Sequence, residues 1–313
     1  NVAGGLGMTG DVAFSGDAPL GFSYALLSRL HEVAPGIRVD ARQPDVVALG
    51  MSTKDAAELE KIRSVSRGAV VAMGRVRDYL GALRAQGDGF RDATNAVATL
   101  GHVRAVLRRA FSEQGLAEDG ESIVSQGRDA GVPHNRGNDA EPIRAGRSII
   151  VDIFPGEAGG GYHTDMTRTF CVGEAPEALR RVYADCRATF DVAMQAVAVG
   201  RPCRAAQEAV CDAFERQGHA TGRSNAGTQE GYVHGLGHGV GLAVHEGPRL
   251  GGGEANRATL APGHVVSVEP GLYYPSREIG VRIEDLVAVL PDGRIENLTP
   301  FPYELEVNVG AHA

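Results

Sequence analysis

The chain has 313 residues, and its 31 Lys and Arg residues against 39 Asp and Glu residues give a formal net charge of −8 at pH 7. This acidic balance argues against a nucleic acid or an anionic membrane as a partner, because both favour a concentrated basic face. The length is ample for a buried core, and no apolar run approaches the roughly 20 residues of a membrane-spanning helix.

Residues 1–50 are expected to form a short N-terminal domain, or the remnant of one. A helix is predicted at 23–33, where Pro35 and Gly36 end it, and the apolar run 46–49 predicts a short strand. The apolar residues of this segment are too few for a large core of its own. Residues 51–313 carry longer periodic segments and are expected to form a second, larger domain.

The larger domain begins with two predicted helices. From Ser52 or Thr53 as far as Leu83, apolar residues recur every three or four positions, which aligns them on one helix face. A second stripe predicts a helix at 92–114, with Val97 to Phe111 on its apolar side. Strand-like segments follow at 122–125, 148–154 and 163–172.

The same order of elements then repeats. Helices are predicted at 176–199 and 205–217, and strand-like runs follow at 265–273 and 280–290. Two halves of the same order predict an α+β fold in which helices pack on a curved, mostly antiparallel sheet. The four cysteines form no CxxC pair, so we expect reduced, packed thiols in a cytoplasmic protein.

Two acidic residues flank the first predicted hairpin. Asp152 lies in the apolar strand 148–154, where a carboxylate is costly to bury without a partner, and Asp165 lies in the next strand. The Gly-rich turn 156–161 falls midway between them. If the strands pair about this turn, the two aspartates face each other with Cβ atoms about 5 Å apart.

The second hairpin repeats this arrangement. Glu269 and Glu284 lie in its two strands, and the turn 275–278 falls midway between them. Buried pairs of like charge repel unless they are protonated or neutralised by cations. The alternative is that Arg168 and Arg282, close in sequence, balance these acids as structural ion pairs. The recurrence in two hairpins favours bound cations.

Three of the ten histidines fall in the segment 234–245. Glycines alternate at positions 235, 237, 239 and 241, which disfavours a helix. In an extended segment, residues four apart lie about 13 Å from each other, so at most one of His234 and His238 is expected to bind an ion. Four carboxylates and one imidazole suit two divalent ions of the Mn²⁺, Co²⁺ or Zn²⁺ type, which would turn a bridging water into a hydroxide nucleophile.

Taken in order, these segments resemble the motifs of the pita-bread metallopeptidases, a family that includes methionine aminopeptidase, aminopeptidase P and prolidase. The resemblance covers about residues 52–307 and rests on Pro133-His134-Asn135, the Asp152 strand, Thr164-Asp-Met-Thr-Arg-Thr-Phe170, His234-Gly-Leu-Gly-His-Gly-Val-Gly-Leu-Ala-Val-His-Glu246, Val268-Glu-Pro-Gly-Leu-Tyr273 and Val281-Arg-Ile-Glu-Asp285. The Thr-Arg-Thr-Phe element and the long His motif resemble the proline-specific branch. A pita-bread fold, with 51–313 as the catalytic metallopeptidase domain, is therefore expected.

Carried over residue by residue, the resemblance implies a ligand set for two divalent ions, Mn²⁺ or Co²⁺ ahead of Zn²⁺. Asp152 would bind one ion, while His238 and Glu269 would bind the other. Asp165 and Glu284 would bridge the two ions.

The resemblance also implies catalytic roles for five residues. His234 and His245 would position the substrate and stabilise the tetrahedral intermediate, and His134 would lie near the scissile bond. Glu269 would shuttle a proton between water and the leaving nitrogen, and Arg282 would lie beside a bridging carboxylate.

The implied reaction is hydrolysis of an Xaa–Pro bond by a prolidase, a dipeptidase acting on a small proline-containing peptide as a homodimer. Proline has no N–H and a fixed φ, so peptidases that need a backbone donor handle this bond poorly. One alternative is an aminopeptidase P-like enzyme that acts on longer peptides. Another is a relative that kept the fold as a binding module or for metal-free chemistry, whose signature would be the loss of ligands.

Overall fold

A computed structural model describes residues 7–16, 18–40, 45–118 and 120–309 of the chain. Its internal contacts divide the chain into one unit of Asn1–Ser52 and a larger unit of Thr53–Ala313. Within the described ranges, no helix combines the length and the apolar character that crossing a membrane requires.

The described residues of the smaller unit form two helices and a pair of parallel strands. Its elements are β1 (Gly10–Val12), α2 (Leu20–Val33), β2 (Ile37–Val39) and α3 (Val46–Ser52). The helix expected at 23–33 is present as α2, which begins at Leu20. Among the described residues of this unit, Ile37 is the one buried hydrophobic side chain, so the expectation of a small core is confirmed.

The strand expected at 46–49 is wrong, because these residues form α3. The Asp45 carboxylate accepts hydrogen bonds from the backbone N–H groups of Val47 and Ala48, each at 3.0 Å. Such a cap satisfies the N–H groups that a helix start leaves without partners and so favours the helix over a short strand.

The first half of the larger unit is built on α4 (Ala56–Gly81) and α5 (Leu100–Glu113). A capping box begins α4, in which the Asp55 carboxylate accepts from the N–H groups of Ala57 and Glu58 while Glu58 accepts from the Asp55 N–H. The apolar stripe expected from residue 59 to residue 80 is buried in the structure.

The second helix is shorter than the expected range 92–114. Residues 84–91, which lie outside the elements expected from the sequence, form the hairpin β3 (Arg84–Gln86) and β4 (Gly89–Arg91). The Asp92 carboxylate then accepts from two N–H groups of a following turn, and the helix starts only after its cap at Thr99. Val97, expected on the buried stripe, is 44% exposed.

A four-stranded sheet packs against these helices. Its order is β17 (Glu306–Val307), β9 (Met166–Val172), β7 (Ser148–Ile153) and β6 (Ile123–Gln126), with β17 parallel to β9 and the other pairs antiparallel. Two smaller elements lie nearby: the pair of β5 (Leu116–Ala117) with β8 (Gly156–Glu157), and the short helix α6 (Gly127–Ala130). A buried apolar cluster joins the sheet to α4 and α5.

The second half repeats the pattern with α7 (Glu177–Ala196) and α8 (Cys203–Arg216). Its antiparallel five-stranded sheet has the order β11 (Glu246–Leu250), β10 (Gly237–Gly239), β12 (Val265–Val268), β15 (Asp285–Val289) and β16 (Ile295–Asn297). A separate hairpin pairs β13 (Gly271–Tyr274) with β14 (Ile279–Arg282) through the 3₁₀ turn η1 (Pro275–Arg277). The repeated order of helices and strands is therefore confirmed.

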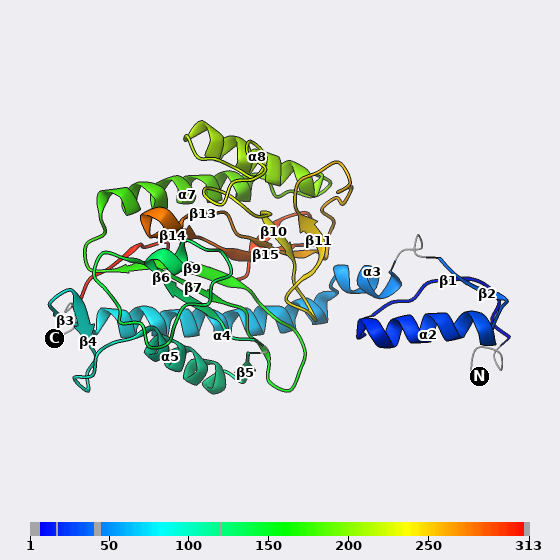
Figure 1. Cartoon of the computed structure of the whole chain (residues 1–313), viewed down its shortest axis with the longest axis horizontal. Coiled ribbons are helices and arrows are strands. Elements are labelled where there is room, and N and C mark those ends of the chain that lie inside the picture. Colours follow the sequence, from blue (N-terminus) through cyan, green and yellow to red (C-terminus); the bar gives the residue numbers. More distant parts are fainter. Residues whose placement is uncertain (1–6, 17, 41–44, 119, 310–313) are drawn as a thin grey trace. The chain divides into compact units, whose positions relative to one another are not determined.

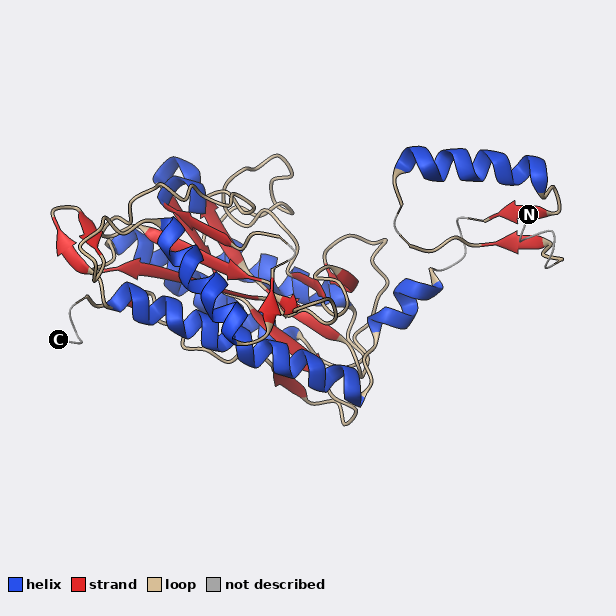
Figure 2. Ribbon diagram, turned by 90° about the horizontal axis from the view of Figure 1, so that it is seen from below, coloured by secondary structure: helices blue, strands red, loops and turns tan. Residues whose placement is uncertain are grey.

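The two helix pairs of the larger unit lie on opposite sides of its strands in Figure 1, with α4 and α5 along one side and α7 and α8 along the other. The view in Figure 2, from below, shows helices lying across the strands. A second buried cluster fills the space between α7, α8 and the strands of the second half. All four cysteines are buried and free, as expected for packed thiols.

Candidate metal centre

The first two acidic residues are brought close together, but in a register different from the expected one. Asp152 in β7 pairs with Thr167 in β9, two residues beyond Asp165. The hairpin turns between Gly159 and Gly160, which both have positive φ, a conformation that glycine adopts readily. The hydrogen bond from the Glu157 N–H to the Tyr162 carbonyl is centred on this point. The turn is therefore centred one residue later than the sequence suggested, which moves the partner of each residue by two positions.

The second hairpin keeps the expected register but breaks where the acids lie. Val268 pairs with Asp285 and Gly271 pairs with Arg282, so Glu269 and Glu284 occupy corresponding positions between the two ladders. The strands expected at 265–273 and 280–290 are each split there, since Pro270 has no N–H for a ladder.

Glu284 pairs instead with the first half of the larger unit. Its backbone N–H donates to the Thr167 carbonyl at 3.1 Å, and the Thr167 N–H donates to the Glu284 carbonyl at 3.4 Å. Asp152, Thr167 and Glu284 thus form a row across three strand segments, with their side chains on one face. This bridge joins the two halves at the proposed site.

Three side chains form the tightest group of possible metal ligands. One ligand atom each from Asp165, His238 and Glu284 lies within 4.8 Å of the others, and these residues are 4%, 6% and 2% exposed. Glu269 adjoins this group, since its Oε1 lies 3.3 Å from Nε2 of His238. The same nitrogen lies 3.7 Å from Oδ2 of Asp165.

Asp152 also lies near this group, since its negative charge helps to raise the pKa of Asp165 and of Glu284. Its Oδ2 accepts a hydrogen bond from Arg282 at 2.7 Å, while its buried Oδ1 has no hydrogen-bond partner among the described residues. An acceptor left without a donor in a buried site is what a bound cation would satisfy. The structure therefore brings together all five residues that the sequence singled out as ligands.

Burial makes the charged form of the site's carboxylates costly, so they favour binding of cations or protons. Burial raises the pKa of Asp165 and of Glu284 well above the usual range, and the negative charges of neighbouring carboxylates add to this. Burial likewise raises the pKa of Glu269 to about 8. Two divalent cations would offset four carboxylates, so the donor set fits such ions.

The imidazole of His238 is neutral and oriented toward these acids. Burial lowers the pKa of His238 to about 4, which leaves the unprotonated form that binds metals. Its Nδ1 lies 3.0 Å from the Gly239 carbonyl, so that Nε2 faces the carboxylates. The segment is extended, as expected, and a Cβ at Gly237 would lie 2.0 Å from the Ser267 carbonyl oxygen.

His234 belongs to a second line of contacts that ends on Asp152. Its Nε2 lies 2.8 Å from the Tyr273 hydroxyl, and Arg282 donates to this hydroxyl at 2.8 Å and to Asp152 at 2.7 Å. Burial, with the charge of Arg282, lowers the pKa of His234 to about 3. Tyr273 was missed as a functional residue, although it ends the motif that begins at Val268.

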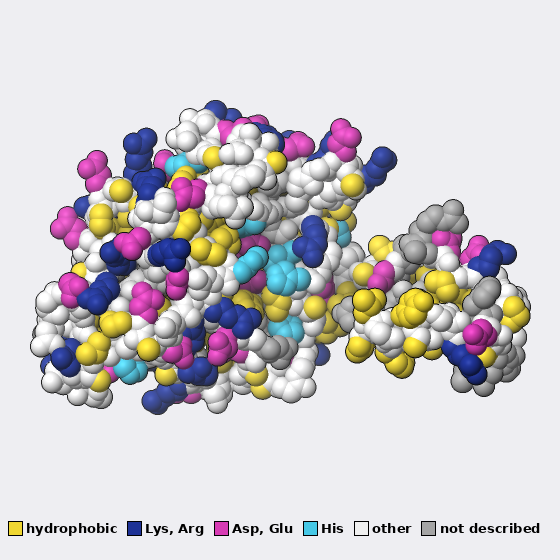
Figure 3. All heavy atoms as spheres, in the orientation of Figure 1, with side chains coloured by type: hydrophobic (Ala, Val, Ile, Leu, Met, Phe, Trp, Pro, Cys, Tyr) yellow, Lys and Arg dark blue, Asp and Glu magenta, His cyan; other side chains and the backbone are white. Residues whose placement is uncertain are grey.

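The other two histidines lie toward the surface. The ring centroid of His245 is 4.2 Å from that of His238, and His245 is exposed. His134 is also exposed, and it lies near enough for its charge to lower the pKa of His234, after the larger effect of burial. Figure 3 shows histidine side chains gathered on one face of the larger unit, with acidic side chains among them. The carbonyl of Pro133, the residue before His134, accepts a hydrogen bond from Arg282 at 3.2 Å.

Arg249 in β11 is a further residue that the sequence interpretation missed. Burial lowers the pKa of His245, and the positive charge of Arg249 adds to this, as it does for His238. An exposed cation therefore lies beside the histidines of the site. Its sequence signal was weak, because Arg249 follows the His motif by only a few residues and resembles any exposed strand residue.

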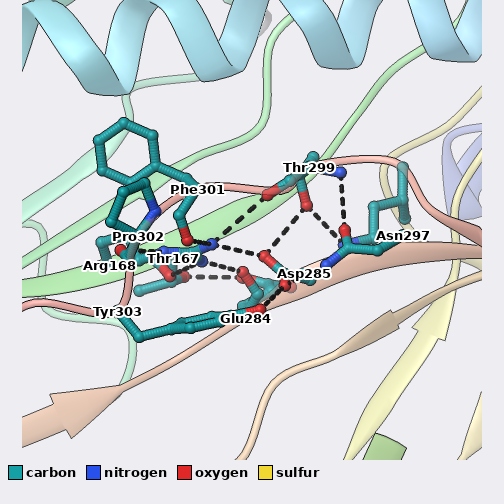
Figure 4. A network of polar contacts seen from close by, with 10 residues as sticks. Thr167, Arg168, Glu284, Asp285, Asn297, Thr299, Phe301, Pro302 and Tyr303 are labelled. Carbon is teal, nitrogen blue, oxygen red and sulfur yellow. Dashed lines mark hydrogen bonds and ion pairs between the residues drawn. The ribbon is translucent and has the colours of Figure 1, made fainter.

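The expected alternative, in which two arginines balance the ligand carboxylates, holds for Arg282 but not for Arg168. Arg168 is 1% exposed and pairs with Asp285 at 2.7 Å, while it also donates to the carbonyls of Thr167 and Glu284. Figure 4 shows this network, with Arg168, Glu284 and Asp285 among its labelled residues. The charge of Arg168 is thus used by Asp285, and the ligand carboxylates keep an excess of negative charge.

Comparison with known proteins identifies related sequences. A family model described as "Metallopeptidase family M24" matches residues 60–291. A protein named "Probable dipeptidase PepE" from Mycobacterium tuberculosis is 32% identical over 263 residues, which are 84% of this chain and 62% of that protein. An "Xaa-Pro dipeptidase" from Pyrococcus furiosus is 32% identical over 173 residues, 55% of this chain and 45% of that protein. The chain thus spans less than two thirds of the length of these curated relatives.

Solved structures agree on the fold. The crystal structure of a dipeptidase PepE from Mycobacterium ulcerans matches with a TM-score of 0.80 and 27% identity, over 98% of this chain and 74% of that chain. An X-Pro aminopeptidase from Thermotoga maritima matches with a TM-score of 0.75 and 22% identity, over 98% and 77% of the two chains. The expected pita-bread fold is confirmed.

Proposed function

The chain belongs to metallopeptidase family M24, and on that premise we propose that it is a dinuclear metal-dependent dipeptidase that hydrolyses Xaa–Pro bonds. One observation carries the proposal: four carboxylates and a neutral imidazole converge in a buried site. Among the described Lys and Arg residues, only Arg282 forms an ion pair with any of these carboxylates. A site of this charge is stable when it holds cations.

The five converging side chains would hold two divalent ions, Mn²⁺ or Co²⁺ ahead of Zn²⁺. The proposed ligands are Asp152, Asp165, His238, Glu269 and Glu284. When bound, such ions polarise a carbonyl and lower the pKa of water, which is the chemistry that hydrolysis of an amide needs.

Among the acids, Glu269 suits the role of proton carrier. Its side chain is 18% exposed, compared with 11% for Asp152 and 6% for Asp165, so substrate can approach it more closely. Its Oε1 accepts a hydrogen bond from the Ser267 hydroxyl at 3.3 Å, which leaves Oε2 to face the substrate. A proton from the attacking water could thus pass through Glu269 to the leaving nitrogen of proline.

The histidines and Arg249 would bind the substrate. His234 and His245 flank the proposed ligand His238, where His245 could donate to the oxygen of the tetrahedral intermediate and His234 would position the substrate, and His134 would lie near the scissile bond. Arg249 supplies a positive charge at the same edge, which suits the free carboxylate of a dipeptide. This supports a small proline-containing peptide as the substrate.

The names of the relatives support the same reaction. One of them is called an Xaa-Pro dipeptidase and another a probable dipeptidase. The test is to load the full chain with Mn²⁺ or Co²⁺ and to compare cleavage of Ala-Pro with cleavage of a longer Xaa-Pro-Yaa peptide. We expect faster cleavage of Ala-Pro. Cleavage of the longer peptide alone would favour an aminopeptidase P-like enzyme, and no metal uptake would favour a binding module.

The active form is proposed to be a homodimer. Large apolar side chains of α2 are exposed, including Leu20 at 85%, Tyr24 at 73% and Phe22 at 63%, and such a patch is typical of an interaction surface. Light scattering coupled to size exclusion should give twice the mass of the chain. A mass of one chain at micromolar concentration would reject the dimer.

A further inference from the structure

A buried ion pair lies outside the ligand set. The ammonium of Lys54 lies 2.8 Å from Oε2 of Glu246, and the two side chains are only 2% and 3% exposed. Most other ion pairs between Lys or Arg and acids are more exposed, as for Arg63 with Glu296, whose side chains are 28% and 33% exposed. A pair so fully removed from water needs a tightly packed setting.

Glu246 closes the loop that carries His245. Its second carboxylate oxygen accepts from the Ala243 N–H at 2.8 Å, while the Gly241 N–H donates to the Ala243 carbonyl at 3.0 Å. At the start of the loop, the Gly241 carbonyl accepts from the His163 N–H at 2.8 Å. The loop 241–246 is therefore tied at both ends, and one tie is the carboxylate that Lys54 neutralises.

The ion pair packs directly on the loop backbone. A Cβ added to Gly241 would lie 2.6 Å from Oε2 of Glu246 and 2.6 Å from Cε of Lys54. There is no space for a side chain between the pair and the loop. A change in the position of the ammonium would therefore be transmitted to the loop by direct contact.

Lys54 itself is held by regular structure. Its backbone N–H donates to the Gly263 carbonyl at 2.8 Å, and the Gly263 N–H donates to Val289 of β15 at 2.8 Å. The next residue, Asp55, caps helix α4. Lys54 thus lies where helix α4 meets the sheet that contains β15, whereas its partner Glu246 lies at the end of the loop 241–246.

We propose that Lys54 is a positioning residue, which fixes the loop 241–246 through Glu246 and thereby holds His245 beside His238. The ring centroids of the two histidines lie 4.2 Å apart, so a shift of the loop by about 1 Å would misplace His245 relative to the substrate. This inference rests on the proposed function for its effect on turnover, but not for its effect on the loop.

Two variants separate positioning from stability. Lys54→Met removes the cation and leaves Glu246 buried without a partner, which lowers the melting temperature and loosens the loop. Lys54→Met combined with Glu246→Met removes both charges together with the carboxylate that binds the Ala243 N–H, so most of the lost stability should return while the loop loses this tie. Arg63→Met on the same helix, which breaks the more exposed pair with Glu296, is the matched control.

The expected results concern two readouts on metal-loaded full chain. Hydrogen exchange of a peptide covering 241–246 should speed up in Lys54→Met and in the double variant, but not in Arg63→Met. Turnover of Ala-Pro should fall about 10- to 100-fold in both Lys54 variants, with metal content and KM nearly unchanged. In the double variant, turnover should stay low although the melting temperature recovers.

Two outcomes would overturn the inference. The first is unchanged hydrogen exchange of 241–246 in the double variant, which decides the matter even if the wild type cleaves no Xaa–Pro peptide. The second is a turnover that recovers together with the melting temperature, since a purely stabilising pair would behave in this way. Failure of the wild type to cleave Ala-Pro would reject the proposed function. Hydrogen exchange would then still test whether Lys54 fixes the loop 241–246.

Discussion

Glu284 and Asp285 are neighbours in the chain, are both buried, and have opposite surroundings. Asp285 accepts hydrogen bonds from Arg168, Asn297, Thr299 and Tyr303, so the protein itself supplies its counter-charge and its donors. Glu284 accepts from the Thr167 hydroxyl at 2.7 Å and faces three other carboxylates across the site. In extended backbone, successive side chains point in opposite directions. Asp285 therefore points to the side where protein groups supply its partners, and Glu284 points to the side that is suited to cations.

This difference explains why the two arginines of the sequence interpretation behave differently. Arg168 lies on the Asp285 side, where it forms an ion pair and donates to backbone carbonyls that hold the Glu284 segment in place. Arg282 lies on the Glu284 side and contacts Asp152 alone among the proposed ligands. The buried carboxylates are thus of two kinds: protein partners stabilise Asp285, whereas cations would stabilise Glu284 and the other proposed ligands.

The largest effect on activity is expected from changes on the Glu284 side. Glu284→Gln and His238→Ala each remove a proposed ligand, so turnover should fall by at least about 10³-fold, the equivalent of several kcal/mol of transition-state stabilisation. Metal content, measured on the purified variants, should fall as well. Full activity in either variant would show that the ligand set is wrong.

The largest effect on stability is expected from the Asp285 side. Asp285→Asn leaves the Arg168 guanidinium buried without a counter-ion, which should cost about 3–5 kcal/mol in the free energy of unfolding, with or without metal. Glu284→Gln should cost little in the metal-free protein, because burial and the neighbouring carboxylates already disfavour the charged form of Glu284. Urea unfolding of both metal-free variants measures these free energies of unfolding. Equal losses in the two variants would contradict the proposed difference between Glu284 and Asp285.

A smaller loss of activity is expected along the line from His234 to Asp152. His234→Ala should lower turnover about 10²-fold, because it removes a side chain that positions the substrate and bonds the Tyr273 hydroxyl, while metal content stays unchanged. Tyr273→Phe removes both hydrogen bonds of this line, from the hydroxyl to His234 and from Arg282 to the hydroxyl, and should cost about tenfold in turnover. Loss of metal in His234→Ala would instead make His234 a ligand.

The stability of the metal-free protein is also expected to depend on pH through Glu269. Because burial raises the pKa of Glu269 to about 8, the folded metal-free protein holds a proton that the unfolded chain releases above its lower, ordinary pKa. Its contribution to stability is therefore present at low pH and is lost as pH rises toward 8, by up to about 1.4 kcal/mol per pH unit. Glu269→Gln should flatten this slope in unfolding measurements at pH 5 to 8, and an unchanged slope would contradict it.

The parts of the fold that follow local rules were predictable from the sequence. The apolar stripe of α4 and the buried strand β7 follow directly from residue spacing. The expected strand at 46–49 failed because a single capping aspartate, Asp45, outweighed the β-branched run. The expected pairing of Asp152 with Asp165 failed because the turn is set by which glycines take positive φ, and the composition of 156–161 does not reveal this.

The site was predictable in its residue types and less so in its connections. The acids and His238 are marked by being charged or polar within apolar or Gly-rich segments. The contact of Lys54 with Glu246 spans 192 positions, and that of Arg168 with Asp285 spans 117, so no local pattern predicts either pair. Such pairs depend on how the two halves of the larger unit meet, where Thr167 and Glu284 form a bridge.

The most direct test of the central claim, that the Glu284 side is built for two cations, is anomalous diffraction from crystals of the full chain grown with Mn²⁺. We expect two manganese peaks among Asp152, Asp165, His238, Glu269 and Glu284, with none beside Asp285. A single peak, no peak, or peaks ligated by other residues would contradict the account.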